Sequence, residues 1–503
     1  MSKPTVKAVN VVWFRDDLRV ADHAALFTAM EEAGAATLTV AVYVHDEASE
    51  GIRPLGAAAK WWLHHALKDL RAELSALGVP LLVRRGSALD KIPYVVDAIC
   101  QYFGLSHSDL SVFWNRRYGG GARAVDANLK KELSQRGCTV TSYSGTLLHE
   151  PWIVQTKEQH PYKVFTPFYN ALQQIPLRTE LPSPTKVQQA VSLDGLDNDE
   201  VDAWDLLPTS PDWSAGLAKT WVPGEAAAHE RLELVLEDVA AQYQEGRDRP
   251  GVDGTTGLSP ALRWGHLSPV QVWHALGALA VQSHEASDGA RAIMRQLAWR
   301  DFCWNQIYLQ PSLTTQNLRP EFDTFDWAWP TEVLPKPSNG PDALAPPSSD
   351  SPAQGSVDAI YKAWCQGKTG FALVDAGMLQ LWETGWMHNR VRMVAASLLV
   401  KNLGIHWRAG EAWFWDTLVD ADAASNPANW QWVAGCGADA APYFRVFNPV
   451  LQAKKFDPNG NYRARYAPAL SQEPLVDLKE SRNAALAAYE HMRQSPRTGD
   501  APH

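Results

Sequence analysis

Two hydrophobic periodicities alternate over residues 9–145. Short apolar runs of strand length recur along this part of the chain, and longer amphipathic stretches separate them. Buried parallel strands form near-continuous apolar runs, whereas the helices that connect them repeat every ~3.6 residues. The pattern therefore predicts an α/β domain with a doubly wound, parallel, five-stranded sheet. The predicted strands are residues 9–14, 37–44, 79–85, 110–115 and 138–143.

The second half of the chain shows only the helical period. From about residue 226 onward the strand pattern stops, and the 3.6-residue period appears in residues 231–243, 271–284 and 390–404. This predicts a second, all-α domain. The expected organisation is an α/β domain over 1–145, a connector over 146–225, a helical domain over 226–470 and a short tail over 471–503. A Pro/Ser-rich insert at 330–357 is expected to form a surface loop.

Composition narrows the class of protein without identifying it. Hydrophobic residues make up 46% of the chain and charged residues 20%, as in ordinary globular proteins. No apolar run approaches the ~18 residues of a membrane span. The five cysteines are scattered without a CxxC pair, so we expect a cytoplasmic protein with no disulfide framework and no metal site. The net charge of −10 excludes indiscriminate coating of nucleic acid but permits a local basic surface.

Glycine motifs give no support for an ordinary dinucleotide site. No GxGxxG pattern follows the first predicted strand. Gly119–Gly121 follow a later strand without a phosphate-loop pattern, and we expect a flexible turn there.

Tryptophan is the unusual component of the sequence. More than half of the 22 Trp residues lie at or after Trp264, in the predicted helical domain. Core filling explains most single tryptophans, because an indole buries a large area. It explains less well the tryptophans that stand among polar and charged residues, which are Trp299, Trp386, Trp407, Trp430 and Trp432.

Three polar segments carry candidate chemistry. Residues 254–269 (GTTGLSPALRWGHLSP) place hydroxyls and N–H groups before a helical run, which suits an anion site or a simple helix cap. Residues 386–393 (WMHNRVRM) should present an indole, an amide, a guanidinium and the thioether of Met393 on one helical face, as a pocket wall or a structural network. In residues 420–432, Asp420 and Asp422 lack companion metal ligands, and we expect Asp420 to pair with Arg392.

Together these segments resemble the photolyase/cryptochrome flavoprotein family, and most of all its class I-type cyclobutane pyrimidine dimer photolyases. The resemblance extends over nearly the whole chain, through VVWFRDDLRVADHAAL (11–26), HPYKVFTPF (160–168), RQLAWRDFCWNQIY (295–308), GKTGFALVDAGMLQLWETGWMHNRVRM (367–393) and ASNPANWQWVAGCGADAAPYFRVFNP (424–449). It implies an α/β antenna domain followed by a helical domain that holds FAD, in agreement with the periodicities.

The resemblance also implies the cofactor-binding residues. The FAD phosphates and ribityl chain would lie against Tyr243, Thr255, Thr256, Gly257, Leu258 and Ser259. The isoalloxazine and adenine would lie against Trp386, Asn389, Arg392, Asp420 and Asp422. Asn426 would face flavin N5, where a neutral amide tolerates an electron-rich reduced ring.

By the same resemblance, the tryptophans have two functions. Trp430 next to the flavin, Trp407 in the middle and Trp327 at the surface would form an electron-hopping chain, with Trp329 as the alternative end. Trp299 and Trp432 would clamp a flipped-out pyrimidine dimer. The other residues implied in DNA contact are Gln296, Arg300, Asn389, Arg390, Met393, Arg247 and Lys455.

Asn389, Met393 and Gln296 decide which reaction the resemblance implies. Relatives that repair (6-4) photoproducts have histidines at the first two positions, so their absence favours light-driven repair of cyclobutane pyrimidine dimers in DNA. Dimer-splitting relatives usually have Glu where this chain has Gln296, so we expect weakened repair.

Two other functions stay open. A cryptochrome-type blue-light photoreceptor would use FAD and the Trp chain for signalling, although the segment after the FAD domain is short. A cofactor-free DNA- or partner-binding protein would be colourless, and the complete set of pocket residues disfavours it.

A second antenna chromophore of deazaflavin, folate or flavin type is compatible with the sequence. Its identity is open, because Gly119 replaces the Glu of folate-binding relatives and Arg263 the Lys of deazaflavin-binding ones. We expect a monomer that acts on damaged DNA and not on a membrane.

Overall fold

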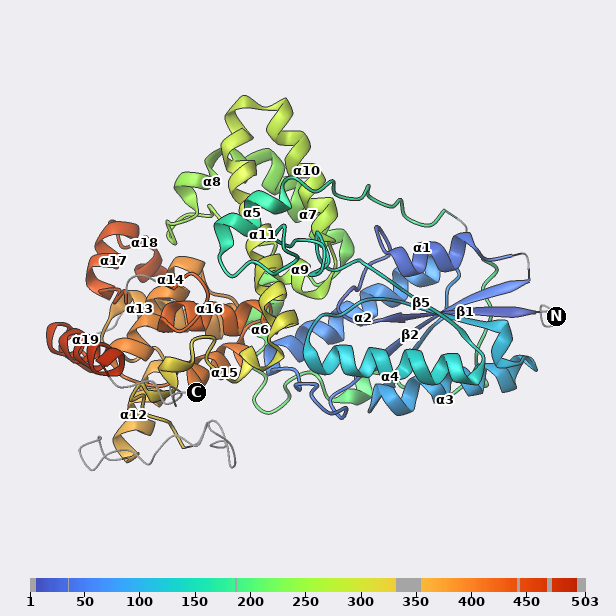
Figure 1. Cartoon of the computed structure of the whole chain (residues 1–503), viewed down its shortest axis with the longest axis horizontal. Coiled ribbons are helices and arrows are strands. Elements are labelled where there is room, and N and C mark those ends of the chain that lie inside the picture. The colour runs from blue at the N-terminus through green and yellow to red at the C-terminus, as the bar shows by residue number, and fades with distance from the viewer. Residues whose placement is uncertain are drawn as a thin grey trace. The chain divides into compact units, whose positions relative to one another are not determined.

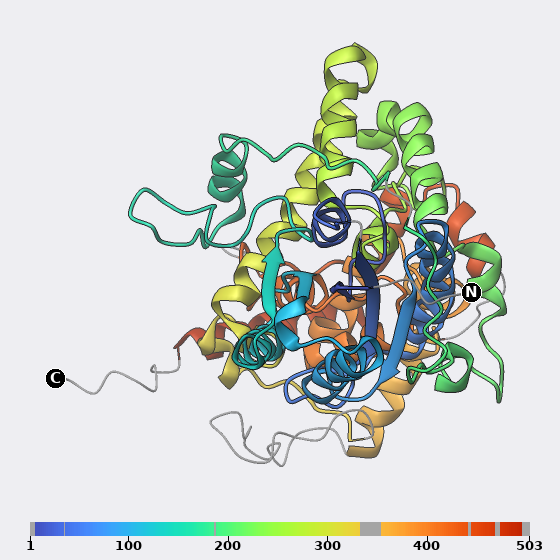
Figure 2. The ribbon, with the colours of Figure 1, turned by 90° about the vertical axis from the view of Figure 1, so that its right-hand side faces the viewer.

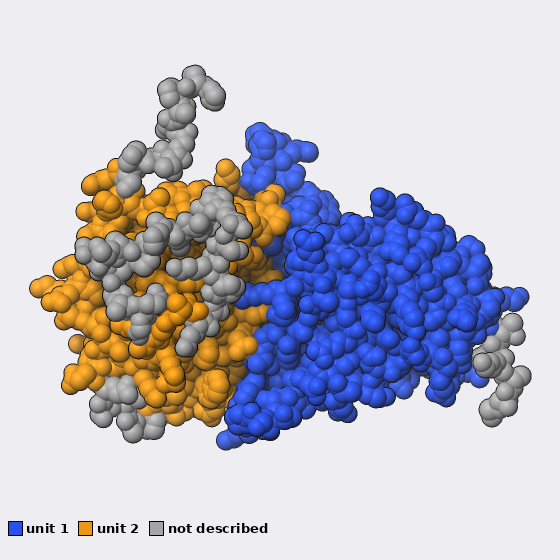
Figure 3. Space-filling model, turned by 90° about the horizontal axis from the view of Figure 1, so that it is seen from below, with its two compact units in different colours: residues 1–161, 169–241, 256–308 blue, residues 162–168, 242–255, 309–503 orange. Residues whose placement is uncertain are grey.

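The structure is a computed structural model, and it describes residues 6–34, 36–185, 188–331, 354–440, 444–467 and 473–494. The chain divides into two compact units, coloured separately in Figure 3. Unit 1 contains residues 1–161, 169–241 and 256–308, and unit 2 contains 162–168, 242–255 and 309–503. This division differs from the domain boundaries expected from composition, which stay a prediction. Most of the insert at 330–357 lies outside the described residues.

Unit 1 is built on a parallel sheet with the strand order β3-β2-β1-β4-β5. The strands are β1 (Ala8–Phe14), β2 (Thr37–His45), β3 (Leu81–Arg85), β4 (Leu110–Asn115) and β5 (Thr139–Tyr143). All five predicted strands are thus confirmed. Helices α3 (Ala88–Phe103) and α4 (Gly120–Arg136) cover one face of the sheet, and α1 (Ala24–Glu31) covers the other (Figures 1 and 2).

The central strands of the sheet in unit 1, β1, β2 and β4, are buried on both faces. Val9, Val11 and Trp13 of β1 pack in one apolar cluster with residues of α3 and α4. The strand order reverses between β1 and β4, so the loops that follow these two strands diverge to opposite faces. Open α/β sheets bind ligands at the carboxyl ends of the strands beside such a reversal.

The flexible turn predicted at Gly119–Gly121 is wrong. Gly119 is the N-cap of α4, and the helix begins at Gly120. A Cβ added to Gly121 would lie 2.2 Å from the carbonyl oxygen of Gly51. Glycine at this position permits the close approach of two backbones.

The other helices of unit 1 include the long α11 (His284–Leu309), of which all but the last residue belongs to this unit. The remaining helices that lie entirely in unit 1 are α2 (Ala57–Ala76), α6 (Ala215–Thr220), α7 (Glu225–Leu234), α9 (Ser259–Trp264) and α10 (Pro269–Gln282). The helix predicted at 231–243 is present, but a π-helical turn at Val235–Val239 joins α7 to α8 (Ala240–Gly246). Helix α8 and the short α5 (Phe165–Leu172) cross between the units.

Unit 2 is helical. Its helices are α12 (Gln354–Cys365), α13 (Ala372–Thr384), α14 (Asn389–Ser397), α15 (Trp407–Thr417), α16 (Ser425–Ala434), α17 (Pro449–Phe456), α18 (Asn461–Tyr466) and α19 (Leu478–Gln494). In the described parts of the chain every named strand lies within residues 8–143, which confirms the prediction of a helical second half. Trp327, Trp364, Trp407 and Trp430 belong to the apolar core of unit 2.

Three further observations concern the described residues only. No helix among them is both long and apolar enough to cross a membrane. The five cysteines are buried, and none of them forms a disulfide. No cluster of three or more His, Cys, Asp and Glu side chains that could hold a metal ion occurs in the described ranges.

Candidate functional site

Tyr243 and Arg247 lie together at the end of α8, in unit 2. The guanidinium carbon of Arg247 is 5.4 Å from the centre of the Tyr243 ring. Beyond them the chain folds back, since a Cβ added to Gly254 would lie 2.5 Å from the Cα of Gly246. Glycines at both positions permit this contact, which leads the chain to Thr255.

Thr256, Gly257, Leu258 and Ser259 belong to unit 1. Gly257 has a left-handed φ of 62°, and α9 begins at Ser259. The Thr256 carbonyl accepts a hydrogen bond of 2.7 Å from Nε of Arg231. Arg231 was not predicted, because in the helical pattern of residues 231–243 it is not distinguished from an ordinary solvent-exposed charge. A guanidinium beside a segment expected to bind phosphate is favourable, because arginine binds phosphate groups strongly.

The segment from Trp386 to Arg392 corrects one prediction. Trp386 does not share a helical face with Asn389, because α13 ends at Thr384, its C-cap Gly385 has a left-handed φ of 65°, and α14 begins only at Asn389. Arg392 instead reaches back, and its Nε donates to the Met387 carbonyl at 2.7 Å. The guanidinium carbon then lies 5.8 Å from the centre of the Trp386 ring.

Arg392 forms the predicted ion pair with Asp420. Its Nη2 donates to both carboxylate oxygens, at 3.1 and 2.9 Å. The Asp420 side chain is only 3% exposed, against 24% for Arg392. A carboxylate so deeply buried needs a cationic partner, and Arg392 supplies it.

Asp422 and Asn426 organise the start of α16. Asp422 Oδ1 accepts from the backbone N–H groups of Ala424 and Ser425, at 2.9 and 2.5 Å. Asn426 Nδ2 donates to both the carbonyl and the carboxylate of Glu411, at 3.1 and 2.8 Å. Glu411 was not predicted, because it lies in an apolar helix 15 residues upstream. Since both partners are acceptors, the amide nitrogen of Asn426 is the atom that faces Glu411.

Trp430 is buried against α15. Its ring is 5.0 Å from that of Phe414, in a T-shaped contact. It also lies over Gly410, where an added Cβ would be 2.1 Å from Cη2 of the indole. Gly410 is three residues after Trp407, so Trp430 packs one helical turn away from the next predicted member of the electron chain.

Trp407 is fully buried at the start of α15, beside His406. The His406 ring lies 5.6 Å from Trp407, 5.0 Å from Trp327 and 4.6 Å from Trp329. The two candidate end tryptophans reach the same imidazole because Ala328 between them forms a β-bridge with Ile405. Burial, with Arg408, lowers the pKa of His406 to about 3, so the imidazole is neutral at pH 7.

Trp364 is an aromatic neighbour of Trp430 that sequence reasoning missed. Its ring is 6.1 Å from Trp430 and 6.2 Å from Tyr361, on which it stacks. Trp364 lies on α12, whose apolar period reads as ordinary core. The only feature of the sequence that could have indicated Trp364 is its position in AWCQGKTG, directly before a polar segment.

Gln296, Trp299 and Arg300 lie on one face of α11 in unit 1, at positions i, i+3 and i+4. Gln296 is exposed and Trp299 is half-buried. Arg300 donates to the Thr146 carbonyl at 2.7 Å, so at least part of its guanidinium anchors a loop.

In unit 2 the residues expected to contact DNA are accessible. Asn389 and Lys455 are exposed, and Trp432, Met393 and Arg247 are half-buried. Arg390 forms an ion pair of 2.7 Å with Asp248. Its guanidinium carbon and the Lys455 ammonium also lie 4.4 and 5.0 Å from the Phe456 ring centre, so a basic surface with an aromatic residue is present.

Asp301, next to Arg300, has an unusual protonation. Its Oδ2 accepts from the backbone N–H groups of Leu148 and His149, at 2.8 and 3.3 Å. Burial raises the pKa of Asp301 to about 7, although Arg300 and these N–H groups oppose the shift. Between pH ~4 and ~7 the Asp301 carboxyl is therefore protonated in the folded protein, whereas in the unfolded chain, where its pKa is ~3.9, it has lost the proton.

Replacing Asp301 with Asn is expected to change the pH dependence of stability. Because the pKa of Asp301 is higher in the folded than in the unfolded protein, this carboxyl lowers the free energy of unfolding of wild type as pH rises from ~4 to ~7. The loss is on the order of 1 kcal/mol for each pH unit. Asn does not titrate, so the variant should gain in melting temperature relative to wild type between pH 5 and 7.5. The exposed Asp288→Asn on the same helix is the control. Parallel pH profiles for wild type and Asp301→Asn would contradict the shift.

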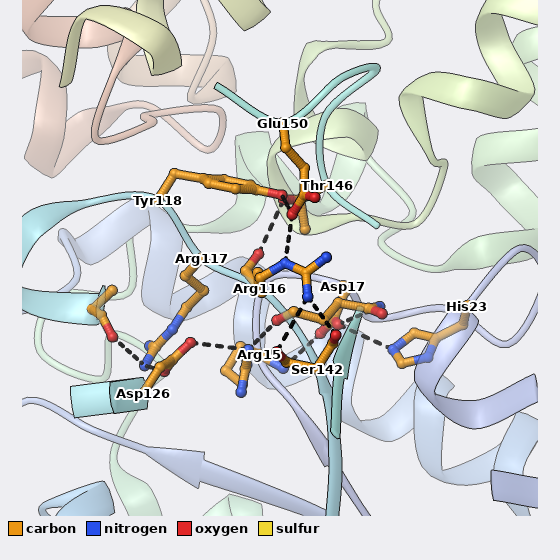
Figure 4. Close-up of polar contacts among 12 residues, drawn as sticks. Arg15, Asp17, His23, Arg116, Arg117, Tyr118, Asp126, Ser142, Thr146 and Glu150 are labelled. Carbon is orange, nitrogen blue, oxygen red and sulfur yellow. Dashed lines mark hydrogen bonds and ion pairs between the residues drawn. The ribbon is translucent and has the colours of Figure 1, made fainter. Parts of the chain in front are cut away.

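A second polar cluster of unit 1 lies at the carboxyl ends of β1 and β4 (Figure 4). Asp17 accepts from Asn115 at 2.9 Å and contacts His23 at 3.0 Å. Burial acts to raise the pKa of Asp17, but His23 and Arg15 together hold it below its usual value. The loop after β4 is fixed by Arg116, which contacts Glu150 at 2.5 Å.

Arg15 is the cation at the centre of this cluster. Its Nη2 donates to the Asn115 carbonyl and lies 3.4 Å from Asp126, which Arg117 contacts at 2.5 Å. Burial lowers the pKa of Arg15 to about 10, which leaves it charged at pH 7. Within this cluster, four buried donor atoms have no hydrogen-bond partner among the described residues: Nε and Nη1 of Arg15, Nε of Arg117 and Nε1 of Trp13.

Comparison with known proteins accounts for both units. The family model for DNA photolyase matches residues 10–186, and the model for the FAD binding domain of DNA photolyase matches residues 293–495. The deoxyribodipyrimidine photo-lyase of Agrobacterium fabrum is 39% identical over 96% of this chain and 98% of its own length. Cryptochrome-1 of Arabidopsis thaliana is 31% identical over 94% of this chain and 65% of its own length.

Solved structures show the same relationship. The bacterial class III photolyase from Agrobacterium tumefaciens superimposes with a TM-score of 0.85 at 38% identity, and covers 97% of this chain and 98% of its own. The predicted fold, an α/β unit and a helical FAD-binding region, is therefore confirmed. On this evidence, the chain belongs to the photolyase/cryptochrome family of flavoproteins.

Proposed function

We propose that this protein repairs cyclobutane pyrimidine dimers in DNA, driven by blue light and an electron from reduced FAD. The observation that carries the proposal is the orientation of α16. Asn426 and Trp430 on this helix are buried, at 9% and 3% exposure, whereas Trp432 is half-buried. One short helix can thus present flavin-contacting groups inward and an aromatic face outward to a substrate.

The polar groups around this helix suit FAD. When bound, FAD supplies the light-driven transfer of one electron. Asn426 directs its NH2 group to Glu411, which leaves the amide carbonyl to accept a hydrogen bond, as the N–H of a reduced flavin requires. The Arg392–Asp420 pair adds polarity without net charge.

The exposed aromatic residues suit a flipped-out dimer. A base stacked on an aromatic side chain gains ~1–3 kcal/mol, which offsets much of the few kcal/mol needed to unstack it. Trp299 and Trp432 are the residues proposed for this contact. Neither Asn389 nor Met393 can act as a general acid. This suits splitting of a cyclobutane dimer, which needs only the transfer of one electron to the dimer and its transfer back to the flavin.

Gln296 sets the efficiency of the proposed reaction, and Gln296→Glu is expected to raise the quantum yield of repair several-fold. A carboxylic acid can hydrogen-bond the dimer carbonyls and donate a proton toward developing negative charge, which an amide cannot. The measurement is light-dependent loss of dimers from a UV-irradiated oligonucleotide, with FAD reduced chemically beforehand. Gln282→Glu, which is exposed at the end of α10, is the matched control.

The same assay separates repair from light sensing. Light-dependent dimer loss in wild type supports the proposal. Absence of loss in both wild type and Gln296→Glu, with FAD bound, would contradict it and favour a cryptochrome-type photoreceptor. Equal rates for the two proteins would show that Gln296 does not contact the dimer.

We also propose that the Arg15 cluster binds the anionic group of a second, light-harvesting chromophore. The cluster lies where doubly wound sheets bind ligands, and its unpaired donors would each cost ~1–3 kcal/mol if left buried without a partner. Folates, deazaflavin cofactors and flavin nucleotides all carry carboxylate or phosphate.

Arg15→Gln is therefore expected to release the second chromophore while FAD is retained. The measurement is chromatography of the chromophores released from wild type and variant, with the more exposed Arg136→Gln of α4 as control. A second chromophore retained by Arg15→Gln, or none in wild type, would contradict this site. Cytoplasmic location and a monomeric state stay predictions.

A further inference from the structure

Trp407 differs from its neighbours Trp327 and Trp364 in the group that accepts its indole N–H. Trp327 and Trp364 donate to backbone carbonyls, of Val400 at 2.9 Å and of Ala395 at 3.1 Å. Trp407 Nε1 donates at 2.8 Å to a side chain, the carbonyl Oδ1 of Asn317. Since Trp407 is fully buried, water does not compete for this hydrogen bond.

Asn317 is in turn oriented by a carboxylate. Its Nδ2 donates to Asp323 Oδ1 at 2.7 Å, which fixes the amide with its carbonyl toward the indole. Asn317 is 8% exposed, and Asp323 is half-buried. The negative charge of Asp323 thus lies two hydrogen bonds from the indole nitrogen, in surroundings where charges interact more strongly than in water.

Gln431 holds this acceptor in place. It lies between Trp430 and Trp432 on α16 and is fully buried. Its Oε1 accepts from the Leu318 N–H at 2.8 Å, and its Nε2 donates to the carbonyls of Leu313 and Gln316 at 2.7 and 3.0 Å. The loop 313–318 that carries Asn317 is therefore attached to the helix that carries Trp430.

We propose that Asn317, oriented by Asp323 and held by Gln431, is a positioning residue that keeps oxidised Trp407 as a protonated cation. The inference rests on the electron-hopping function proposed for Trp407. In the hop, Trp407 gives one electron to oxidised Trp430 and becomes an indole cation, and an electron from the end tryptophan later refills it. No proton needs to move.

The chemistry of the acceptor decides whether the proton stays. Oxidation makes the indole N–H acidic, and a carboxylate or water would remove the proton and leave a neutral radical that is harder to reduce. An amide oxygen is too weak a base to do so. It still accepts a strong hydrogen bond from the cation, because a hydrogen bond from a charged donor is stronger than one between neutral groups. Asp323 stabilises the same cation at longer range.

The test places the oxidised site on Trp407 by removing both end tryptophans, with Trp327→Phe and Trp329→Phe. Flash absorption of this FAD-bound background then distinguishes the indole cation from the neutral radical. With Asn317 present, the cation should persist until the electron returns to it from the photoreduced flavin. With Asn317→Asp it should convert to the neutral radical, with a slower rate in D2O. With Asn317→Leu its population should fall at least about tenfold, the equivalent of ~1.4 kcal/mol.

A second readout requires neither light nor FAD. The Trp407 indole N–H signal, assigned by its loss in Trp407→Phe, should be shifted and slow to exchange in the 15N NMR spectrum of the apoprotein. Asn317→Leu should remove both properties. Asp323→Asn should reduce the shift, whereas the exposed Asp326→Asn of the same segment should not.

The outcomes separate this inference from the proposed function. An unchanged cation lifetime in Asn317→Asp, or an unchanged indole signal in Asn317→Leu, would overturn the role of Asn317. Unaltered flavin photoreduction in Trp407→Phe would overturn it as well. Dimer repair by chemically reduced enzyme needs no hop through Trp407, so its failure in wild type would count against the repair function and leave the spectroscopic result standing.

Discussion

Trp430→Phe is expected to slow the photoreduction of bound FAD roughly 100-fold, the effect of a barrier raised by ~2.7 kcal/mol. Phenylalanine fills most of the same space beside Phe414 and Gly410, but its ring is far harder to oxidise than indole. Repair of dimers by chemically reduced enzyme should remain, because hopping is needed only to recharge the cofactor. The measurement is the rate of flavin bleaching under blue light with a thiol reductant.

Trp413→Phe is the matched control for this experiment. Trp413 lies on the same helix α15 and stacks on Trp382 at 6.2 Å. The proposed electron-hopping chain includes neither of these two tryptophans. FAD bound to the Trp413→Phe variant should therefore be photoreduced at the wild-type rate. If Trp430→Phe lost photoreduction and dimer repair in equal measure, Trp430 would be structural and not an electron carrier.

Arg392→Leu is expected to release FAD and to destabilise unit 2 by ~3–5 kcal/mol, because it leaves Asp420 buried without its partner. The measurements are flavin absorbance per protein and the melting temperature. Arg482→Leu, exposed on α19, is the control and should keep both at wild-type values.

The double variant Arg392→Leu/Asp420→Asn separates structure from binding. Removing the charge of Asp420 should restore most of the lost stability, since the uncompensated carboxylate is gone. FAD should still be lost if Arg392 contacts it. Recovery of FAD binding together with stability would contradict a direct contact and leave Arg392 a structural role only.

The sheet of unit 1 could be predicted almost residue by residue, because its central strands β1, β2 and β4 are buried on both faces and form apolar runs. The ion pair of Arg392 and Asp420 was also predictable, since a buried carboxylate restricts its own choice of partner. The family resemblance supplied the roles proposed for Trp430 and Asn426, which no local pattern distinguishes from core residues.

The partners of those residues could not be predicted. Glu411 and Asn317 reach their positions only when distant helices and loops pack, and neither lies at a spacing that marks a site. Trp386 was assigned to the wrong helical face because a glycine within a helical pattern is usually tolerated, whereas Gly385 ends its helix. Local sequence gives the elements, and long-range packing decides which polar groups meet.

The contact of Gly410 with Trp430 has a consequence for how this family can vary. While position 430 carries an indole, position 410 admits no side chain, since the first carbon added there would overlap the ring. Among homologues the two positions should therefore change together, with alanine or serine at 410 appearing only where 430 is small. In a library randomised at both positions, the folded variants with tryptophan at 430 should all have glycine at 410. Sequencing the folded variants would reveal this pairing.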